Sequence, residues 1–359
     1  MLHISLPRHR TPVMADPLHH GPPLPPLDPE QLRPVFVVGM NGSGTTMLVE
    51  SLGRHPRLYA FPRETRAFPQ LITALQQFGD LATDENFLEL WNTVASLPEI
   101  QIKNGMQPVP IPSNWREHPR TLATVIDAVM RHFACQQGKS RWAEKTPQHV
   151  LHISTLAELF PQAQFIHIIR DGRDCAASFH RRWKRTPALT IRRWRHAVRE
   201  GRKQGERLGP RRYLEVHYER LTEDPEQWMR RICAFLDLPF HPEVLKSSWP
   251  QSDRRGKEDT IRPNADRWRS YFSAREVRRL EAIAGHTLAE MGYVVSTEGT
   301  DSDPPRAALR YWTLRDGLRQ ASYYVWKKAS GEYRDHSWRI IFSLILQGIR
   351  QQIKTKTRG

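Results

Sequence analysis

Residues 35–46, VFVVGMNGSGTT, join a run of apolar, β-favouring residues to a loop rich in glycine and hydroxyl side chains. The residues that follow, 47–52, have helical character. A strand, a tight loop and a helix start together make a cradle for phosphate, because backbone N–H groups at a helix N-terminus point at the anion and the helix dipole favours negative charge there. The stretch therefore predicts an α/β fold with an anion site beyond its first strand.

The same loop almost fits the pattern G-x-x-x-x-G-K-[ST] of nucleotide hydrolases. Gly39 and Gly44 stand at the two glycine positions, but Thr45 stands where that pattern has lysine. The lysine reaches the β- and γ-phosphates of ATP and GTP. Its absence favours a nucleotide without a transferable γ-phosphate, and a kinase-like enzyme remains an alternative hypothesis.

A second candidate anion site follows residues 165–169, FIHII, which read as a buried strand. Arg170 comes directly after them, and Ser178 lies eight residues further on, in the helix expected next. Ligands of open α/β sheets bind beyond the carboxyl ends of the strands. A guanidinium fork and a hydroxyl at this place suit a second phosphate group.

A phosphate loop without the lysine, together with the strand, arginine and serine, resembles the sulfotransferase family, which uses 3′-phosphoadenosine 5′-phosphosulfate (PAPS) as donor. Four further segments resemble the family and keep its order: Glu64-Thr65-Arg66, Glu144-Lys145-Thr146-Pro147, residues 213–221 with the helix ending FLDLP, and residues 261–268, IRPNADRW. The Glu-Thr-Arg segment is similar to that of protein-tyrosine sulfotransferases and related bacterial enzymes. The resemblance covers roughly residues 35 to 293.

The resemblance implies a P-loop-like parallel sheet flanked by helices, PAPS as co-substrate and no metal. It implies that Glu64 is the catalytic base and that Lys145 neutralises charge on the bridging oxygen, with Arg63 and Arg66 beside the substrate. The loop would hold the 5′-phosphosulfate of PAPS, and Arg170 and Ser178 its 3′-phosphate. The implied donor-binding residues are Asn41, Gly42, Ser43, Gly44, Thr45, Thr46, Arg170, Ser178, Tyr218 and Arg262.

Each of these assignments has an alternative. Glu64 and Arg66 could form a surface ion pair, Lys145 could be solvated, and His180 is the rival base. Gly42 departs from the family, whose loop usually has Arg or Lys just before Ser-Gly-Thr-Thr. Arg63, Arg66 or Lys145 would then supply the missing charge, or the rate is low, or the loop geometry differs. The departure also leaves open a non-catalytic relative that binds a nucleotide or polyanion.

The acceptor is expected to carry a hydroxyl group, and we favour a glycan or polysaccharide, with tyrosyl protein or a small molecule as alternatives. The 359 residues carry a net charge of +16, which favours acidic partners. No nucleic-acid-binding pattern accompanies this charge, so nucleic acid is not expected. The three cysteines are far apart and predict neither a disulfide framework nor a metal site. With no signal-peptide pattern, a cytoplasmic protein is expected.

Three regions are predicted along the chain. Residues 1–34, with nine of the 28 prolines, read as a flexible leader, residues 35–298 as the sulfotransferase domain, and residues 299–359 as a basic, aromatic, helical C-terminal extension. Residues 305–359 hold 12 Lys/Arg against three Asp/Glu, and their apolar run 340–349 is too short to span a bilayer. It predicts a helix lying in the inner face of a membrane, or else a helix packed on the core or in a homodimer.

Strands are predicted from residue 35, at 165–169 and at 213–218. Residues 101–117 are predicted to be an irregular loop over the acceptor. Helices are predicted at 71–97 with a break near 78–80, 121–136, 148–160, 188–205, 224–238 and 273–291.

Overall fold

The computed structural model describes residues 21–24, 33–247, 259–261, 263–296 and 299–329. The chain forms two compact units, each made of two separate stretches. The first unit comprises Met1–Ile169 and Glu200–Asn264, and the second comprises Arg170–Arg199 and Ala265–Gly359. The predicted domain boundaries after residues 34 and 298 remain predictions.

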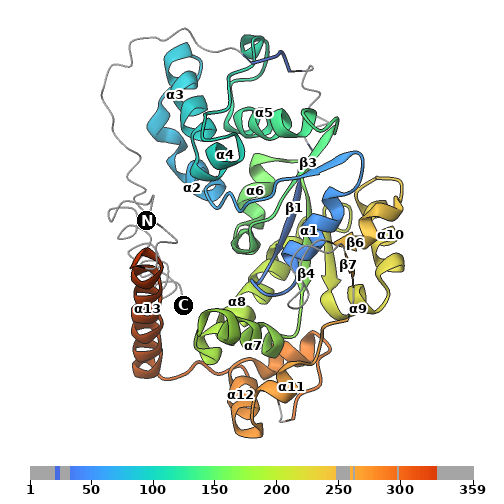
Figure 1. Cartoon of the computed structure of the whole chain (residues 1–359), viewed down its shortest axis with the longest axis vertical. Coiled ribbons are helices and arrows are strands. Elements are labelled where there is room, and N and C mark those ends of the chain that lie inside the picture. Colours follow the sequence, from blue (N-terminus) through green and yellow to red (C-terminus); the bar gives the residue numbers. More distant parts are fainter. Residues whose placement is uncertain (1–20, 25–32, 248–258, 262, 297–298, 330–359) are drawn as a thin grey trace. The chain divides into compact units, whose positions relative to one another are not determined.

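A five-stranded parallel sheet with the order β2-β3-β1-β4-β5 forms the centre of the first unit (Figure 1). Its strands are β1 (Val35–Gly39), β2 (Leu58–Ala60), β3 (Arg141–Glu144), β4 (Gln164–Ile169) and β5 (Tyr213–His217). Every residue of β1 and of β4 is buried, as expected for parallel strands that are covered on both faces. The predicted fold class, a parallel sheet flanked by helices, is confirmed.

The alternation of side chains along β1 builds a separate core on each face of the sheet. Val35 and Val37 join the hydrophobic cluster with residues of α1 (Thr45–Gly53), α9 (Tyr218–Glu223) and α10 (Pro225–Phe235). Phe36 points to the opposite face, where it packs against the rings of Trp142, Phe160 and Phe165. The sheet therefore has a packed hydrophobic layer on each of its faces.

Further short elements complete the first unit. The helices are α2 (Phe68–Ala74), α3 (Asp84–Ala95), α4 (Pro98–Lys103), α5 (Leu122–Cys135) and α6 (Ile153–Leu159). The 3₁₀ turns are η2 (Leu75–Phe78), η3 (Trp115–Glu117), η4 (Pro147–Leu151) and η5 (Pro242–Leu245), and a small antiparallel pair joins β6 (Lys246–Ser247) to β7 (Asp259–Thr260). Within the predicted leader, Gly21 N donates to Ile111 O (2.7 Å) and Leu24 N donates to Asn114 Oδ1 (3.0 Å), so residues 21–24 are held against the 101–117 segment.

The second unit is helical among its described residues. It contains α7 (Gly172–Trp183), α11 (Trp268–Tyr271), α12 (Ala274–Glu290) and α13 (Arg306–Ala329), and α8 (Pro187–Glu206) begins in it and ends in the first unit. The capping box of Ser273 and Glu276 fixes the start of α12.

The predicted strands at 35, 165–169 and 213–218 are confirmed, and each predicted helix contains helical structure, with 148–160 divided into η4 and α6. The C-terminal extension is helical over α13, whereas the apolar run 340–349 lies outside the described residues. Across the described part of the chain, every helix is either too short or too polar to cross a bilayer. Strands β2 and β3 were not predicted.

Candidate functional site

The loop between β1 and α1 owes its shape to three glycines. Gly39, Gly42 and Gly44 have φ values of 150°, 90° and 100°, in the region that glycine adopts without strain. A Cβ on Gly44 would lie 2.5 Å from Cδ2 of Tyr218, so the tyrosine ring lies directly against the loop. Ser43 N donates to Met40 O (3.0 Å) and tightens the turn.

The start of α1 fits an anion. Its first turn contains no acidic residue, and Gly44, the residue before the helix, supplies no side-chain hydrogen bond to cap it. The N–H groups of the first turn of an α-helix point away from the helix along its axis, and the helix dipole favours negative charge at that end. A sulfated nucleotide that presents its anionic end to α1 therefore fits the residues present.

The candidate donor-binding side chains of this loop differ in exposure. Asn41 and Thr46 are half-buried, whereas Ser43 and Thr45 are only 0% and 3% exposed. The side chains of Ser43 and Thr45 thus lie inside the loop, and the donor-binding roles of its backbone and hydroxyl groups stay predictions.

Glu64 and Lys145, the two predicted catalytic residues, lie in direct contact within the first unit. Lys145 Nζ donates to Glu64 Oε1 at 2.9 Å. Arg66 binds the other carboxylate oxygen, Oε2, through Nη2 (2.6 Å) and Nε (3.0 Å). Side-chain exposure is 18% for Glu64, 11% for Lys145 and 60% for Arg66, so the pair is sheltered while Arg66 reaches solvent.

Glu144, which the sequence analysis did not single out, is the hub that joins the segments carrying this pair. It is fully buried, and its Oε1 accepts hydrogen bonds from Thr65 N (3.0 Å), Thr65 Oγ1 (3.0 Å) and Thr146 Oγ1 (2.5 Å). Its Oε2 lies 3.1 Å from His149 Nδ1. Burial alone would raise the pKa of Glu144, but His149 and the hydrogen bonds from Thr146 and Thr65 hold that pKa below its ordinary value.

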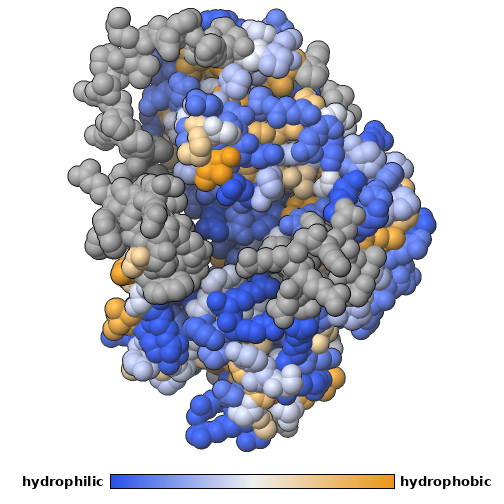
Figure 2. Space-filling model, in the orientation of Figure 1, coloured by the Kyte–Doolittle hydropathy of each residue, from blue (hydrophilic) through white to orange (hydrophobic). Residues whose placement is uncertain are grey.

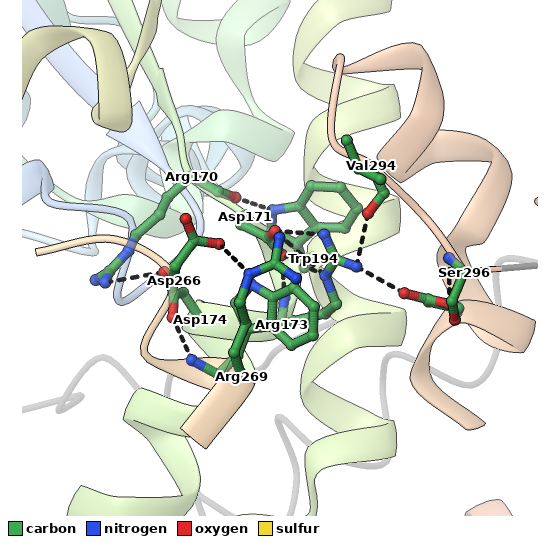
Figure 3. A network of polar contacts seen from close by, with 11 residues as sticks. Arg170, Asp171, Arg173, Asp174, Trp194, Asp266, Arg269, Val294 and Ser296 are labelled. Atoms are coloured by element: carbon green, nitrogen blue, oxygen red, sulfur yellow. Dashed lines mark hydrogen bonds and ion pairs between the residues drawn. The ribbon is translucent and has the colours of Figure 1, made fainter. Parts of the chain in front are cut away.

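Arg170 belongs to the second unit and begins the segment that leads into α7 (Figure 3). Its guanidinium is mostly buried, and Nη2 lies 3.4 Å from Asp174 Oδ2. Its carbonyl oxygen accepts a hydrogen bond from Trp194 Nε1 (2.8 Å). Asp174 and the half-buried Ser178 follow at intervals of four residues, which places both on one face of α7. Burial raises the pKa of Asp174 above its ordinary value, although the charge of Arg170 acts in the opposite direction.

Arg173 fixes the start of α7 from inside the second unit (Figure 3). Its guanidinium binds both oxygens of Asp171, Glu281 Oε1 (2.6 Å) and Val294 O (2.9 Å), and it lies 3.9 Å from the centre of the Trp268 ring. Sequence reasoning missed this role, although a doubled arginine–aspartate pattern, RDGRD, is visible at residues 170–174.

Arg63 is exposed, and Arg262 lies outside the described residues. His180, the rival base, has its Nδ1 3.2 Å from Tyr271 Oη in the second unit, and burial lowers the pKa of its imidazole. Across the described residues, no cluster of His, Cys, Asp and Glu side chains is suited to hold a metal ion.

Known proteins resemble this chain in sequence. The family model described as "Sulfotransferase family" matches residues 34–242, more than half of the chain. The protein-tyrosine sulfotransferase of Drosophila melanogaster is 26% identical over 221 residues, which are 59% of this chain and 39% of the relative. Protein-tyrosine sulfotransferase 1 of Danio rerio is 25% identical over 59% of this chain and 55% of the relative. The chain thus spans only about half, or less, of the length of these relatives.

Among solved structures, the sulfotransferase domain from the Synechococcus PCC 7002 olefin synthase is 25% identical. The match covers 74% of this chain and 96% of that one, with a TM-score of 0.45. The match to residues 34–242 includes the glycine loop, the Glu64 and Lys145 segments and Arg170 with α7. The chain therefore belongs to the sulfotransferase family.

Proposed function

We propose that the protein transfers a sulfuryl group from PAPS to the hydroxyl group of an acceptor. The observation that carries the proposal is the sheltered contact between Glu64 and Lys145, at 2.9 Å, in a unit whose phosphate loop lacks the lysine of ATP enzymes. The loop and the start of α1 would bind the phosphosulfate end of PAPS. For Arg170 and Ser178 we keep the role that the family resemblance implies, binding of a 3′-phosphate.

The contact suggests how the two side chains act in one step. The acceptor oxygen attacks sulfur, the bond from sulfur to the bridging phosphate oxygen breaks, and Glu64 takes the hydroxyl proton. Protonation removes the charge that holds Lys145, so the ammonium can then donate to the bridging oxygen, where negative charge develops. The products are a sulfate ester and 3′,5′-ADP, and no metal takes part in this scheme.

Lys145 and Arg66 are candidates for the cation that the loop lacks at Gly42, where the family usually has Arg or Lys. Both side chains form ion pairs with Glu64 in the same unit as the loop. Lys145 is the more sheltered of the two, so its charge is screened less by solvent. We assign the compensating charge to Lys145.

Turnover of labelled PAPS with a panel of glycans, tyrosyl peptides and phenols tests the proposed reaction. Wild-type protein should transfer label to at least one acceptor, and Lys145→Met and Glu64→Gln should each lower kcat about 100-fold. Both variants should keep their affinity for 3′,5′-ADP, which lacks the sulfuryl group. Lys203→Met, at an exposed position in α8, serves as the control and should match wild type.

Two outcomes would contradict the proposal. A larger thermal stabilisation by ATP with magnesium than by 3′,5′-ADP would favour the kinase-like alternative. Binding of 3′,5′-ADP without transfer to any acceptor would favour the non-catalytic relative.

For the acceptor, we propose an acidic glycan. Arg63 and Arg66 are exposed cations next to Glu64, and the chain carries a net charge of +16, which attracts anionic polymers. Arg63→Gln should then raise KM for a carboxylated or sulfated glycan and leave KM for a neutral phenol unchanged. The relatives named as protein-tyrosine sulfotransferases make tyrosyl peptides the alternative, and preference for these peptides would overturn the glycan assignment.

We also propose that the protein binds anionic membrane surfaces through α13. Tyr311, Leu314, Leu318 and Val325 follow one side of this helix and are 45–64% exposed, and hydrophobic residues reach the surface along it (Figure 2). The opposite side is anchored, because Asp316 accepts hydrogen bonds from Thr186 N (3.0 Å) and Oγ1 (2.7 Å). The helix carries six Lys/Arg against one Asp, as interfacial helices do.

Sedimentation with vesicles tests the membrane proposal. Wild-type protein should bind vesicles that contain phosphatidylserine and should dissociate from them at high salt. It should not bind neutral vesicles. Leu314→Ser combined with Leu318→Ser should weaken this binding. The proposal is overturned if the wild-type protein does not bind anionic vesicles but forms a dimer that the same substitutions disrupt. That result would make this side of α13 a dimer interface.

A further inference from the structure

One carboxylate oxygen binds the residues next to both candidate catalytic side chains. Thr65, which follows Glu64, donates its N–H and its hydroxyl to Glu144 Oε1, each at 3.0 Å. Thr146, which follows Lys145, donates its hydroxyl to the same oxygen at 2.5 Å. The segments that carry Glu64 and Lys145 are therefore tied at a single atom.

The hub itself is fixed from its other side. Glu144 Oε2 lies 3.1 Å from Nδ1 of His149, and the imidazole ring of His149 stacks on Phe68, the first residue of α2 (6.0 Å between ring centres, 21° between planes). Glu144 and His149 are 0% and 1% exposed. Both oxygens of this buried carboxylate therefore have close polar neighbours, with the hydrogen bonds at Oε1.

The connection matters because the segment after β2 leaves the sheet. The backbone hydrogen bond from Phe61 N to Ala143 O (2.9 Å) joins this segment to β3. Beyond that bond, the segment after β2 and the segment after β3 are linked by side chains: by Glu144 and by the contact of Glu64 with Lys145. In addition, Arg66 N donates a hydrogen bond to Thr146 Oγ1 (3.3 Å). Arg66 has a φ of 50°, which a non-glycine residue adopts only when its surroundings impose it.

We propose, resting on the sulfuryl-transfer function above, that Glu144 is a positioning residue that aligns Glu64 with Lys145 through Thr65 and Thr146. Hydrogen bonds to a charged carboxylate are stronger than those between two neutral groups, and removal of a buried acceptor leaves its donors without a hydrogen-bond partner. The buried carboxylate thereby sets the distance across which the proton-accepting and charge-neutralising groups act.

Substitution of Glu144 by glutamine tests the alignment. Glu144→Gln keeps the volume but brings an amide group toward either the threonine donors or His149. Because a misplacement of about 1 Å can cost about 100-fold in rate, we expect kcat to fall 10- to 100-fold while the Kd for 3′,5′-ADP stays within about twofold. Thr65→Val and Thr146→Val, which each remove one hydroxyl donor, should lower kcat by smaller factors.

Asp127 supplies a matched control. Asp127, in α5, is also a buried carboxylate. It accepts a hydrogen bond (2.7 Å) from Nε1 of Trp142, which lies in β3, the strand that contains Glu144. Asp127→Asn should change the melting temperature without the loss of kcat, because Trp142 precedes the segment that carries Lys145. A double-mutant cycle adds a second test. In a Glu64→Gln background, Glu144→Gln should lower kcat by a much smaller factor than it does in wild type.

Amide hydrogen exchange separates this proposal from the proposed function, since it requires no turnover. The Thr65 N–H should be protected in wild type and should exchange faster in Glu144→Gln but not in Asp127→Asn. Absence of transfer by the wild type would contradict the proposed function alone. The positioning role is overturned if Thr65 exchange is unchanged in Glu144→Gln, or if this variant loses no more kcat than Asp127→Asn.

Discussion

Glycine at position 44 meets two separate constraints, its φ of 100° and the Tyr218 ring 2.5 Å from where a Cβ would lie. We expect Gly44→Ala to lower the free energy of unfolding by about 2–4 kcal/mol, because it adds an unfavourable backbone conformation to a steric overlap. Affinity for 3′,5′-ADP should fall as well, since the loop must shift. Urea denaturation and calorimetric titration measure the two effects.

Gly138→Ala is the control for this prediction. Gly138 has a φ of 65°, but among the described residues, its two chain neighbours aside, no atom lies within 4 Å of the point where its Cβ would stand. The substitution therefore introduces backbone strain without overlap. Gly138→Ala should lower the free energy of unfolding by about 1 kcal/mol and leave the affinity for 3′,5′-ADP unchanged. Equal losses of stability in the two variants would show that the contact with Tyr218 contributes nothing.

The limits of sequence reasoning at this scale are visible at neighbouring positions. Motif resemblance was sufficient to select Glu64 and Lys145, and the structure brings their side chains together at 2.9 Å. It did not select Glu144, although this residue directly precedes Lys145. The role of Glu144 depends on hydrogen bonds from Thr65, 79 residues away, and such a contact follows only from the pairing of β2 with β3.

Helix α8 packs closely on the sheet because two of its residues have no side chain. A Cβ on Gly201 would lie 2.5 Å from Val150 Cγ2, and one on Gly205 would lie 2.1 Å from the Tyr213 ring. Alanine favours a helix over glycine by about 1 kcal/mol, but the overlap should outweigh this gain. We expect Gly205→Ala to lower the free energy of unfolding by about 1–3 kcal/mol in urea denaturation.

An exposed position in the same helix gives the comparison. Lys203→Ala changes helix propensity little and removes no buried contact, so its stability should stay close to that of wild type. A Gly205→Ala protein more stable than wild type would mean that the helix is free to move away from Tyr213.

The elements that the sequence predicted are those whose patterns are long or strongly apolar. β1 and β4 are continuous apolar runs, and α5, α8 and α12 have helical periodicity over 14 to 20 residues. β2 has three residues, and β3, RWAE, has a charged residue at each end. Both of these strands depend on tertiary pairing, which short local patterns do not reveal.

At the scale of the whole molecule, buried histidines should make the fold sensitive to acid. His167 is fully buried with Nδ1 2.7 Å from Tyr213 Oη, and burial lowers its pKa to about 3. Below pH 6.5 the unfolded chain binds a proton at this site that the folded chain does not, so stability falls as the pH is lowered. The expected contribution is up to about 1.4 kcal/mol per pH unit between pH 6.5 and 3.

Urea denaturation at pH 7.5, 6.5 and 5.5 measures this dependence. His167→Gln should show a shallower fall in unfolding free energy from pH 6.5 to 5.5 than wild type, whatever its stability at pH 7.5. His196→Gln, at an exposed position, should keep the wild-type slope. Parallel curves for wild type and His167→Gln would contradict a neutral buried imidazole.

The strand order β2-β3-β1-β4-β5 has a consequence for synthesis on the ribosome. β1 is made first and occupies the centre of the sheet, yet its partners are residues 143–144 and 164–168, which emerge much later. Until then a fully apolar strand has both of its edges unpaired, the condition under which nascent chains associate with one another. Among the described strands, the central strand of the folded sheet is thus the one whose first partner is synthesised latest after it.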